Sequence, residues 1–275
     1  MAKISVYTMT TDAIKNEYFT VEGIKSALVF ADEVVVLDGG SSDNTIEQIK
    51  NIGDSRVKIY TNKWLHSLGK GMYAIQKSLA LGYCTGDWCV LMDSDEVYHE
   101  KDSEAIKRLP DVVADSVDCI IFNTLHFYKD YRHLLNGCPD WKDLYTEKVY
   151  MVRNGLNIHH GAVGYDPDNH VDNDGQPIPD DKKILVQVCS YHYGHVRSPE
   201  YYVAKYNRIE RAFHGDKHID KTIEDFEWVP EYKLTNFKGT HPAVMKNRID
   251  TGTNHSKILE LYNYCEGDAD GNEGV

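Results

Sequence analysis

Apolar residues in the first hundred positions recur in two alternating patterns. Short runs of consecutive apolar, often β-branched residues predict buried strands, and apolar positions three or four apart predict helices. Strands are expected at residues 4–9, 33–37, 56–60 and 88–92. Helices are expected at residues 18–30, 43–53 and 71–81. This repeated strand–helix order predicts an α/β fold with a doubly wound, mostly parallel sheet.

The second half of the chain is less regular. Strands are expected at residues 118–124, 148–152 and 183–191, and a helix at residues 198–215. Pro199 suits the first turn of that helix, and Gly215 suits its end. Residues 164–183 are rich in Pro, Gly, Asp and Asn, which predicts a long surface loop.

The formal net charge of −13 sets the character of the surface. A negative surface repels phosphate backbones, so general nucleic-acid binding is not expected. The local exception is a basic stretch that we interpret as a solvated helix face. Its members are Arg197, Lys205, Arg208, Arg211 and Lys217.

Cysteine spacing and apolar run length bear on the compartment. The six cysteines form no Cys-x-x-Cys pair, and we interpret them as reduced thiols. The sequence has no apolar run approaching ~20 residues and no secretory-type start. We therefore expect a cytoplasmic protein without a transmembrane segment.

The sharpest motif is LMDSDE, residues 91–96. Asp93 and Asp95 follow a buried strand and point the same way if the backbone stays extended. Two close carboxylates are costly unless a cation lies between them. Mg²⁺ and Mn²⁺ prefer such oxygens together with phosphate oxygens. The motif therefore predicts a metal site that holds a diphosphate, although an isolated Asp-x-Asp is usually a solvated turn.

A second motif, VVVLDGGSSDNT, covers residues 34–45. Its strand delivers Asp38 to the carboxyl end, and Gly39 and Gly40 let the backbone approach a ligand closely. Ligands of such sheets bind beyond the carboxyl ends of the strands. We predict that Asp38 accepts hydrogen bonds from a nucleoside base or ribose, and that Ser42 or Asp43 caps the following helix.

Together the two motifs resemble the family-2-type glycosyltransferases of the GT-A fold. That family has a D-D-G-S-x-D-x-T type loop, and residues 38–45 read DGGSSDNT, with glycine at position 39 where a second aspartate is commonest. The family also has Gly-Asp/Glu-aromatic, a strand and D-x-D-D/E, which residues 86–88 and 93–96 match. The resemblance covers residues 4 to about 100.

The resemblance implies an enzyme that moves a sugar from a nucleotide donor, with uridine diphosphate favoured, to a hydroxyl of a glycan or another acceptor, with inversion. It implies Mn²⁺ or Mg²⁺ held by Asp93, Asp95 and a late histidine. We favour His192, which ends a strand, and His195 stays open. The implied donor-binding residues are Thr8, Asp38, Gly40, Lys70, Asp93 and Ser94.

The resemblance also divides the chain by role. Residues 1–110 would form the nucleotide-sugar-binding half, and residues 111–265 the half of the same domain that completes the metal site and binds the acceptor. Residues 266–275 would be a flexible acidic tail.

The catalytic base is the least defined part of the predicted site. An inverting transferase needs a group that takes the proton of the acceptor hydroxyl. Our candidates are Asp140, Asp166 and His160, and no spacing separates them from their neighbours Asp143, Asp168 and His159.

Two alternatives remain at this point. The first is a nucleotidyltransferase-like enzyme on a similar fold. Such enzymes commonly have a Gly-rich basic loop after the first strand, where this chain has TMTTDAIKNE, residues 8–17. The second is a non-catalytic sugar-binding protein, against which the retained carboxylates argue.

Overall fold

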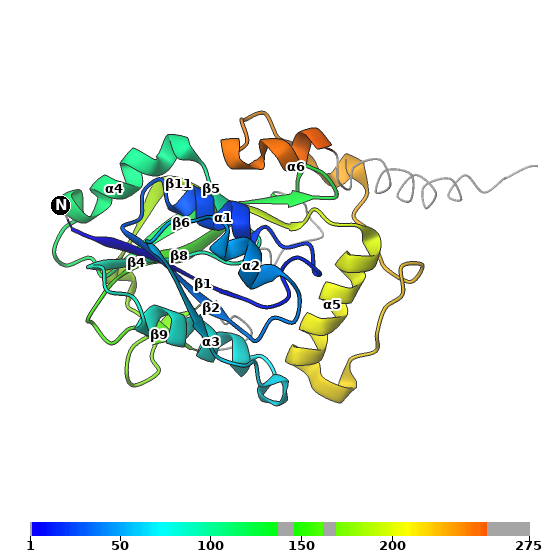
Figure 1. Cartoon of the computed structure of the whole chain (residues 1–275), viewed down its shortest axis with the longest axis horizontal. Helices are drawn as coiled ribbons and strands as arrows, with labels where there is room; N and C mark the ends of the chain where they lie inside the picture. Colours follow the sequence, from blue (N-terminus) through cyan, green and yellow to red (C-terminus); the bar gives the residue numbers. More distant parts are fainter. Residues whose placement is uncertain (1, 137–145, 162–168, 252–275) are drawn as a thin grey trace, which may run out of the picture.

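The computed structural model describes residues 2–136, 146–161 and 169–251 and has a mixed α/β fold (Figure 1). The strands are β1 (Ile4–Thr10), β2 (Glu33–Asp38), β3 (Val57–Thr61), β4 (Trp88–Leu91), β5 (Glu96–Tyr98), β6 (Cys119–Tyr128), β7 (His133–Leu134), β8 (Glu147–Arg153), β9 (His159–His160), β10 (His170–Val171), β11 (Lys183–His195) and β12 (Thr235–Asn236). The helices are α1 (Thr20–Ala27), α2 (Thr45–Lys50), α3 (Gly71–Gly82), α4 (Ser103–Val112), α5 (Pro199–His214) and α6 (Lys246–Thr251).

One large sheet organises the chain. Its strands run in the order β12-β7-β6-β8-β4-β1-β2-β3, and β11 pairs with both β6 and β5. Strands β4, β1, β2 and β3 are parallel, whereas β8 lies antiparallel between β4 and β6. The predicted α/β class is confirmed, and its doubly wound parallel part is the N-terminal half.

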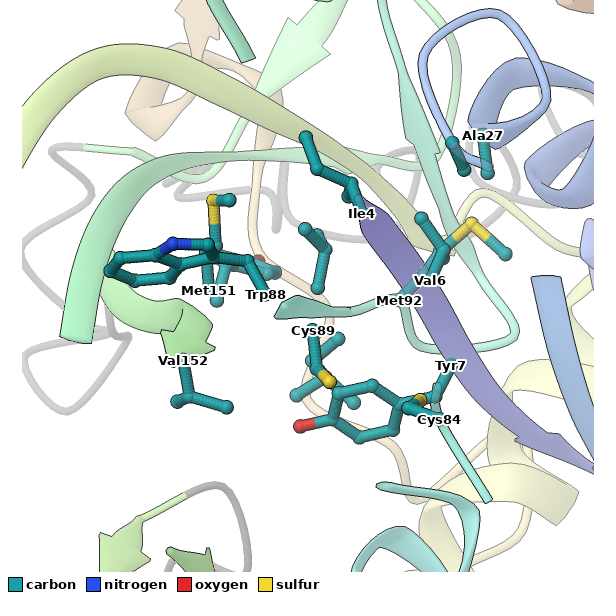
Figure 2. Close-up of a cluster of buried hydrophobic side chains, with 14 of the residues drawn as sticks. Ile4, Val6, Tyr7, Ala27, Cys84, Trp88, Cys89, Met92, Met151 and Val152 are labelled. Carbon is teal, nitrogen blue, oxygen red and sulfur yellow. The ribbon is translucent and has the colours of Figure 1, made fainter. Parts of the chain in front are cut away.

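The core forms where the sheet is buried on both faces. Consecutive residues 34–37 of β2 have no solvent exposure, as expected for a central parallel strand. Along β1, Ile4 and Val6 point to one side of the strand and Tyr7 to the other (Figure 2). The four cysteines within the described residues are free thiols, as predicted.

Several predicted boundaries change. The helix expected at residues 18–30 is only Thr20–Ala27, because residues 28–30 form a turn. Helix α4 and the short strand β5 were not predicted. Strand β11 is longer than expected and runs to His195. In the described parts of the chain, no helix has the length and apolar character needed to cross a membrane.

Helix α5 matters most for the candidate site. In Figure 1 it lies beyond the carboxyl ends of β1 and β2. It is preceded by Arg197, and its residue Lys205 contacts Asp95 just after β4. The second half of the chain thereby covers the edge at which the two predicted motifs end.

Candidate active site

The acidic motif after β4 is a tight turn rather than an extended segment. The Glu96 N–H donates to the Asp93 carbonyl over 3.0 Å. The Ser94 hydroxyl donates to the Met9 carbonyl over 2.5 Å, and the Phe19 N–H donates to the Ser94 carbonyl over 3.0 Å. These contacts fix the turn against β1 and α1. The expectation that both carboxylates share one direction is therefore wrong.

Asp93 is held between two buried lysines. Lys77 of α3 lies 2.9 Å from Oδ1, and Lys148 of β8 lies 2.9 Å from Oδ2. Lys148 also contacts Glu96 Oε1 at 3.1 Å, and the Tyr150 hydroxyl donates to the same oxygen over 2.6 Å. We call these five residues the lysine cluster. Two acids and two bases balance each other in it.

Burial and ion pairing compete in the lysine cluster. Burial alone would raise the pKa of Asp93, but Lys148 and Lys77 outweigh burial and hold that pKa well below its usual range. Burial raises the pKa of Glu96 and lowers the pKa of Lys77. Ionised Asp93 is therefore a fixed partner of the lysines in this structure.

Asp95 has a different set of partners. Its Oδ2 lies 2.7 Å from Lys205 Nζ and 3.4 Å from an Arg197 nitrogen. Its Oδ1 lies 3.6 Å from His192 Nε2. Burial would raise the pKa of Asp95, but Lys205, His192 and Arg197 together hold it well below its usual range. Asp95 is thus an anion among more positive than negative groups.

The backbone comes unusually close to Asp95 and His192 at Gly194. A methyl group there would lie 2.5 Å from His192 Nε2 and 2.6 Å from Asp95 Oδ2. Any residue with a Cβ atom would push the ring and the carboxylate apart. Glycine is therefore required at this position for the two side chains to keep their spacing.

Two further histidines gather around His192, the histidine that faces Asp95. One ring nitrogen from each of His126, His192 and His195 lies within 4.8 Å of the others. His126 Nδ1 and His192 Nδ1 are 3.0 Å apart, and His195 Nδ1 is 3.2 Å from the Tyr202 hydroxyl. Burial lowers the pKa of both His192 and His195 well below the usual value. We call the three residues the histidine cluster.

The loop after β2 uses Asp38 to hold its own shape. The carboxylate accepts hydrogen bonds from the N–H groups of Gly40 and Ser41 and from the Ser41 hydroxyl. Gly40 has φ of +92°, which favours glycine. Asp38 is only 4% exposed, so its predicted contact with a nucleoside requires some of these bonds to be exchanged.

The packing of Trp64 explains why position 39 is glycine rather than the aspartate that is commonest in the family. A Cβ atom on Gly39 would lie 2.3 Å from the Trp64 ring. The backbone N–H of Trp64 also donates to the Gly39 carbonyl over 3.1 Å. The indole therefore takes the space that an aspartate side chain would need. Asp43 accepts from the Thr45 N–H, but the N-cap residue of α2 is Asn44, without a side-chain capping bond, so the prediction of Ser42 or Asp43 as the cap is wrong.

The remaining predicted site residues lie in surroundings different from that of Asp95. Thr8 is completely buried in β1. Lys70 precedes α3, and its Nζ lies 6.0 Å from the Phe213 ring centre. His160 is buried, and its Nε2 lies 2.7 Å from the Tyr7 hydroxyl. The candidate bases Asp140 and Asp166 lie outside the described residues.

The interpretation of the basic stretch around α5 as a solvated face is wrong for Arg197, Lys205 and Arg208, which turn inward. Arg197 is completely buried, and its guanidinium lies 4.2 Å from the Tyr18 ring centre. Arg208 donates to the Tyr18 hydroxyl over 2.9 Å. Arg211 and Lys217 are exposed, whereas Lys205 and Arg208 are partly buried. The first three cations turn inward because α5 packs over the buried carboxylate of Asp95, which needs countercharge.

Sequence reasoning missed Lys77, Lys148 and His126. Lys77 lies three residues after Ala74 and four before Leu81, so it shares the buried stripe of α3. Lys148 and His126 lie in strands, at positions that alternate with partly buried ones and share a face with buried residues. A charged or imidazole side chain on a buried face was the available signal.

The comparisons with known proteins fit this geometry. The family described as glycosyl transferase family 2 matches residues 14–165, more than half of the 275 residues. The chain belongs to glycosyl transferase family 2. The resemblance stated from the two motifs is thereby confirmed.

Relatives of this family-2 chain are themselves named as glycosyltransferases. The uncharacterized glycosyltransferase RP128 of Rickettsia prowazekii is 32% identical over 203 residues, which are 70% of this chain and 61% of that protein. The SPbeta prophage-derived glycosyltransferase SunS of Bacillus subtilis is 26% identical over 167 residues, 60% of this chain and 34% of that protein. The family-2 chain thus spans about a third of SunS.

Solved structures give a more distant likeness. Staphylococcus aureus TarS 1–349 in complex with UDP-GlcNAc has a TM-score of 0.44 at 15% identity, over 76% of this chain and 66% of that chain. Glucosyl-3-phosphoglycerate synthase of Mycobacterium tuberculosis has a TM-score of 0.37 at 19% identity, over 57% of each chain.

The residues around Asp95 fit a divalent ion. Two ligand atoms that share such an ion at about 2.1 Å lie roughly 3 to 3.5 Å apart. The 3.6 Å between Asp95 Oδ1 and His192 Nε2 is close to that spacing. Asp93 fits less well, because a lysine lies 2.9 Å from each of its oxygens.

Proposed function

We propose that this family-2 chain is a metal-dependent glycosyltransferase that moves a sugar from a nucleotide donor, UDP by family resemblance, to a hydroxyl acceptor with inversion. The observation that carries the proposal is the position of Asp95. It follows a central parallel strand, its Oδ1 faces His192, and its Oδ2 is paired with Lys205 and Arg197. A carboxylate with a free metal-binding side and adjacent cations suits a diphosphate.

The topology supports a nucleotide lying across the strand ends. Strand β1 pairs with β2 on one side and with β4 on the other, so the loops at Asp38 and Asp95 flank the end of one strand. The base and ribose would lie at the Asp38 loop. The diphosphate would lie near Asp95, where Lys205 and Arg197 supply positive charge.

The proposed reaction exchanges one bond for another. The bond between the sugar anomeric carbon and the diphosphate oxygen breaks, and the acceptor oxygen forms a bond to that carbon from the opposite face. A base takes the hydroxyl proton, and Asp140 and Asp166 remain the candidates. His160 is a weaker one, because it is buried against Tyr7. When bound, Mn²⁺ or Mg²⁺ stabilises charge on the departing nucleotide.

The acceptor is a hydroxyl of a glycan or of another molecule. General nucleic-acid binding is not part of this function, because a surface with a net charge of −13 repels phosphate backbones. We also propose that the protein acts in the cytoplasm. Neither point affects the donor chemistry at Asp95.

Titration calorimetry of the full chain with UDP, with and without Mn²⁺, tests the donor site. We expect binding that requires the metal and is weakened at least tenfold in Asp95→Asn. Asp111→Asn is the matched control, because Asp111 is exposed on α4. UDP binding that is unchanged in Asp95→Asn would contradict the proposed site.

Sugar transfer to an acceptor mixture tests the reaction. We expect Asp95→Asn to lower the rate by roughly a thousandfold, because charge stabilisation at the leaving group is a large part of catalysis. Circular dichroism should show an unchanged fold. A variant with full transfer activity would remove Asp95 from the mechanism.

A further inference from the structure

We propose that His126, His192 and His195 jointly bind one transition-metal ion through their ring nitrogens, with His192 using Nδ1 while its Nε2 faces Asp95. This inference rests on the metal dependence of the proposed function but changes the ligands: an ion bound at His192 Nδ1 leaves Asp95 to orient that ring through Nε2. It replaces a choice between His192 and His195 by a set that contains both, and it adds His126. It also names the class of ion as one that favours nitrogen ligands.

The distances within the histidine cluster suit a shared ion. Imidazole nitrogens bind such ions at about 2.0–2.1 Å, so nitrogens on one ion lie roughly 3 to 4 Å apart. His126 Nδ1 and His192 Nδ1 are already 3.0 Å apart. One nitrogen from each of the three rings lies within 4.8 Å of the others, so the rings need to close only slightly.

An irregularity in strand pairing brings His192 and His195 to the same place. Residues three apart on a regular strand point to opposite faces. Here His192 pairs with His126 and His195 pairs with Tyr128, so three steps along β11 match two along β6. Such a bulge re-aims side chains and is frequent next to functional sites. It turns both rings of β11 toward the ring on β6.

The surroundings hold all three rings in place. Only 1% of His126 and 7% of His192 are exposed, so surface mobility does not disperse these rings. His195 is fixed through its Nδ1 by the Tyr202 hydroxyl at 3.2 Å. A ring nitrogen held by a neighbour orients the other nitrogen, as is usual for metal-binding histidines.

Three imidazoles determine which ions compete. Mg²⁺ prefers oxygen ligands and gives up its waters reluctantly, whereas imidazole suits zinc, iron, cobalt and nickel, and Mn²⁺ to a lesser degree. A site made of Asp95 and one histidine would discriminate weakly. A site with three histidines should bind Co²⁺ or Zn²⁺ far more tightly than Mg²⁺.

Metal titrations of the chelator-treated full chain test the ligand set. Visible absorption follows Co²⁺, a chromophoric competitor follows Zn²⁺, and calorimetry follows Mg²⁺. We expect Co²⁺ affinity at least a hundredfold above Mg²⁺ affinity. Each single change His126→Asn, His192→Asn and His195→Asn should weaken Co²⁺ binding at least tenfold and alter its spectrum.

A buried histidine elsewhere serves as the matched control. His99 is buried, and its Nε2 lies 2.9 Å from the Thr240 hydroxyl, so His99→Asn should change Co²⁺ affinity less than twofold. If a cluster variant does not fold, pulsed electron paramagnetic resonance of the wild-type chain with Mn²⁺ counts the bound imidazoles. Three are expected, and one would overturn the inference.

Other outcomes separate this inference from the proposed function. A His126→Asn variant with the wild-type Co²⁺ spectrum and affinity overturns the three-histidine set. UDP binding that needs Asp95 would still support the donor site in that case. Conversely, three-histidine binding of Co²⁺ in a chain that binds no nucleotide supports the metal site and contradicts the proposed function.

Discussion

Asp93 and Asp95 are separated by one residue, yet they belong to opposite kinds of environment. Asp93 lies in the lysine cluster, where a cation lies 2.9 Å from each of its oxygens. Asp95 presents one oxygen to Lys205 and the other to His192 at 3.6 Å. The first carboxylate is saturated by the fold, and the second keeps a side for a ligand.

The surroundings of Asp93 and Asp95 also differ in net charge. The lysine cluster pairs Asp93 and Glu96 with Lys77 and Lys148, so its charges cancel. Around Asp95 the cations of α5 and the preceding loop outnumber the single carboxylate. A balanced buried network stabilises a turn, whereas an excess of positive charge attracts an anion such as a diphosphate. Two identical residue types in one motif therefore have different tasks.

The largest expected effect on stability comes from breaking the lysine cluster. Lys148→Met leaves Asp93 and Glu96 buried with less countercharge, and we expect it to lower the free energy of unfolding by about 3–5 kcal/mol. Urea denaturation measures the change. Lys205→Met is the comparison: it should cost less stability but weaken UDP binding. Equal losses of stability in both variants would contradict the proposal that Lys148 stabilises the fold whereas Lys205 serves ligand binding.

The pH dependence of stability tests whether Lys77 and Lys148 are charged, because His170 lies near both lysines. Burial first, then Lys77 and Lys148, lowers the pKa of His170 to about 3. Its unfolded pKa is about 6.5, so the unfolded chain binds the extra proton between these values. Stability should be full above about pH 6.5 and fall as the pH drops toward 3.

At pH 5, His170 should lower the free energy of unfolding by roughly 2 kcal/mol, because each pH unit below 6.5 costs about 1.4 kcal/mol. Urea denaturation of the wild-type chain and of His170→Gln at pH 7 and pH 5 isolates it. We expect a smaller loss between these pH values in the variant. An identical loss in both would show that His170 is protonated in the folded chain.

Gly194→Ala tests whether metal binding depends on the spacing between His192 and Asp95. The added methyl would lie 2.5 Å from His192 Nε2, and relieving that overlap should cost about 1–3 kcal/mol and weaken metal binding. Gly82→Ala is the control, because a Cβ atom at Gly82, the last residue of α3, meets nothing within 4 Å. It should be neutral or stabilising by up to about 1 kcal/mol. Equal metal affinity in both variants would argue against a metal site at Asp95.

The smallest expected effect concerns Lys70. Lys70 is partly exposed just before α3, so Lys70→Ala should change the free energy of unfolding by no more than about 0.5 kcal/mol. The prediction that it assists the donor diphosphate requires a clear loss of UDP affinity in the same variant. Unchanged affinity would assign that role to the cations next to Asp95 instead.

Local patterns in the sequence predicted the elements that carry the site. The buried runs of β1, β2 and β4 and the helices between them follow from apolar periodicity, which acts over a few neighbouring residues. The two acidic motifs came out at the ends of β2 and β4 for the same reason. Asp95 and His192 were therefore both identifiable before any contact between them was known.

Long-range pairing was beyond such patterns. Lys77 and Lys148 come from α3 and β8, and only the folded chain brings both to Asp93. The extended form expected of the acidic motif failed because Ser94 is bonded to β1 and α1. A sequence does not display which of two carboxylates a distant lysine will reach.

The sequence by itself determined the family, the α/β class and the acidic ends of two strands, because these depend on local periodicity and on short motifs. Tertiary structure alone decided that Asp93 is neutralised, that Asp95 faces His192, and that His126 and His195 gather around His192. It did so through the register between β6 and β11 and the packing of α5. The energy of buried charge depends on which opposite charges lie within a few ångströms, and only the folded chain sets those distances.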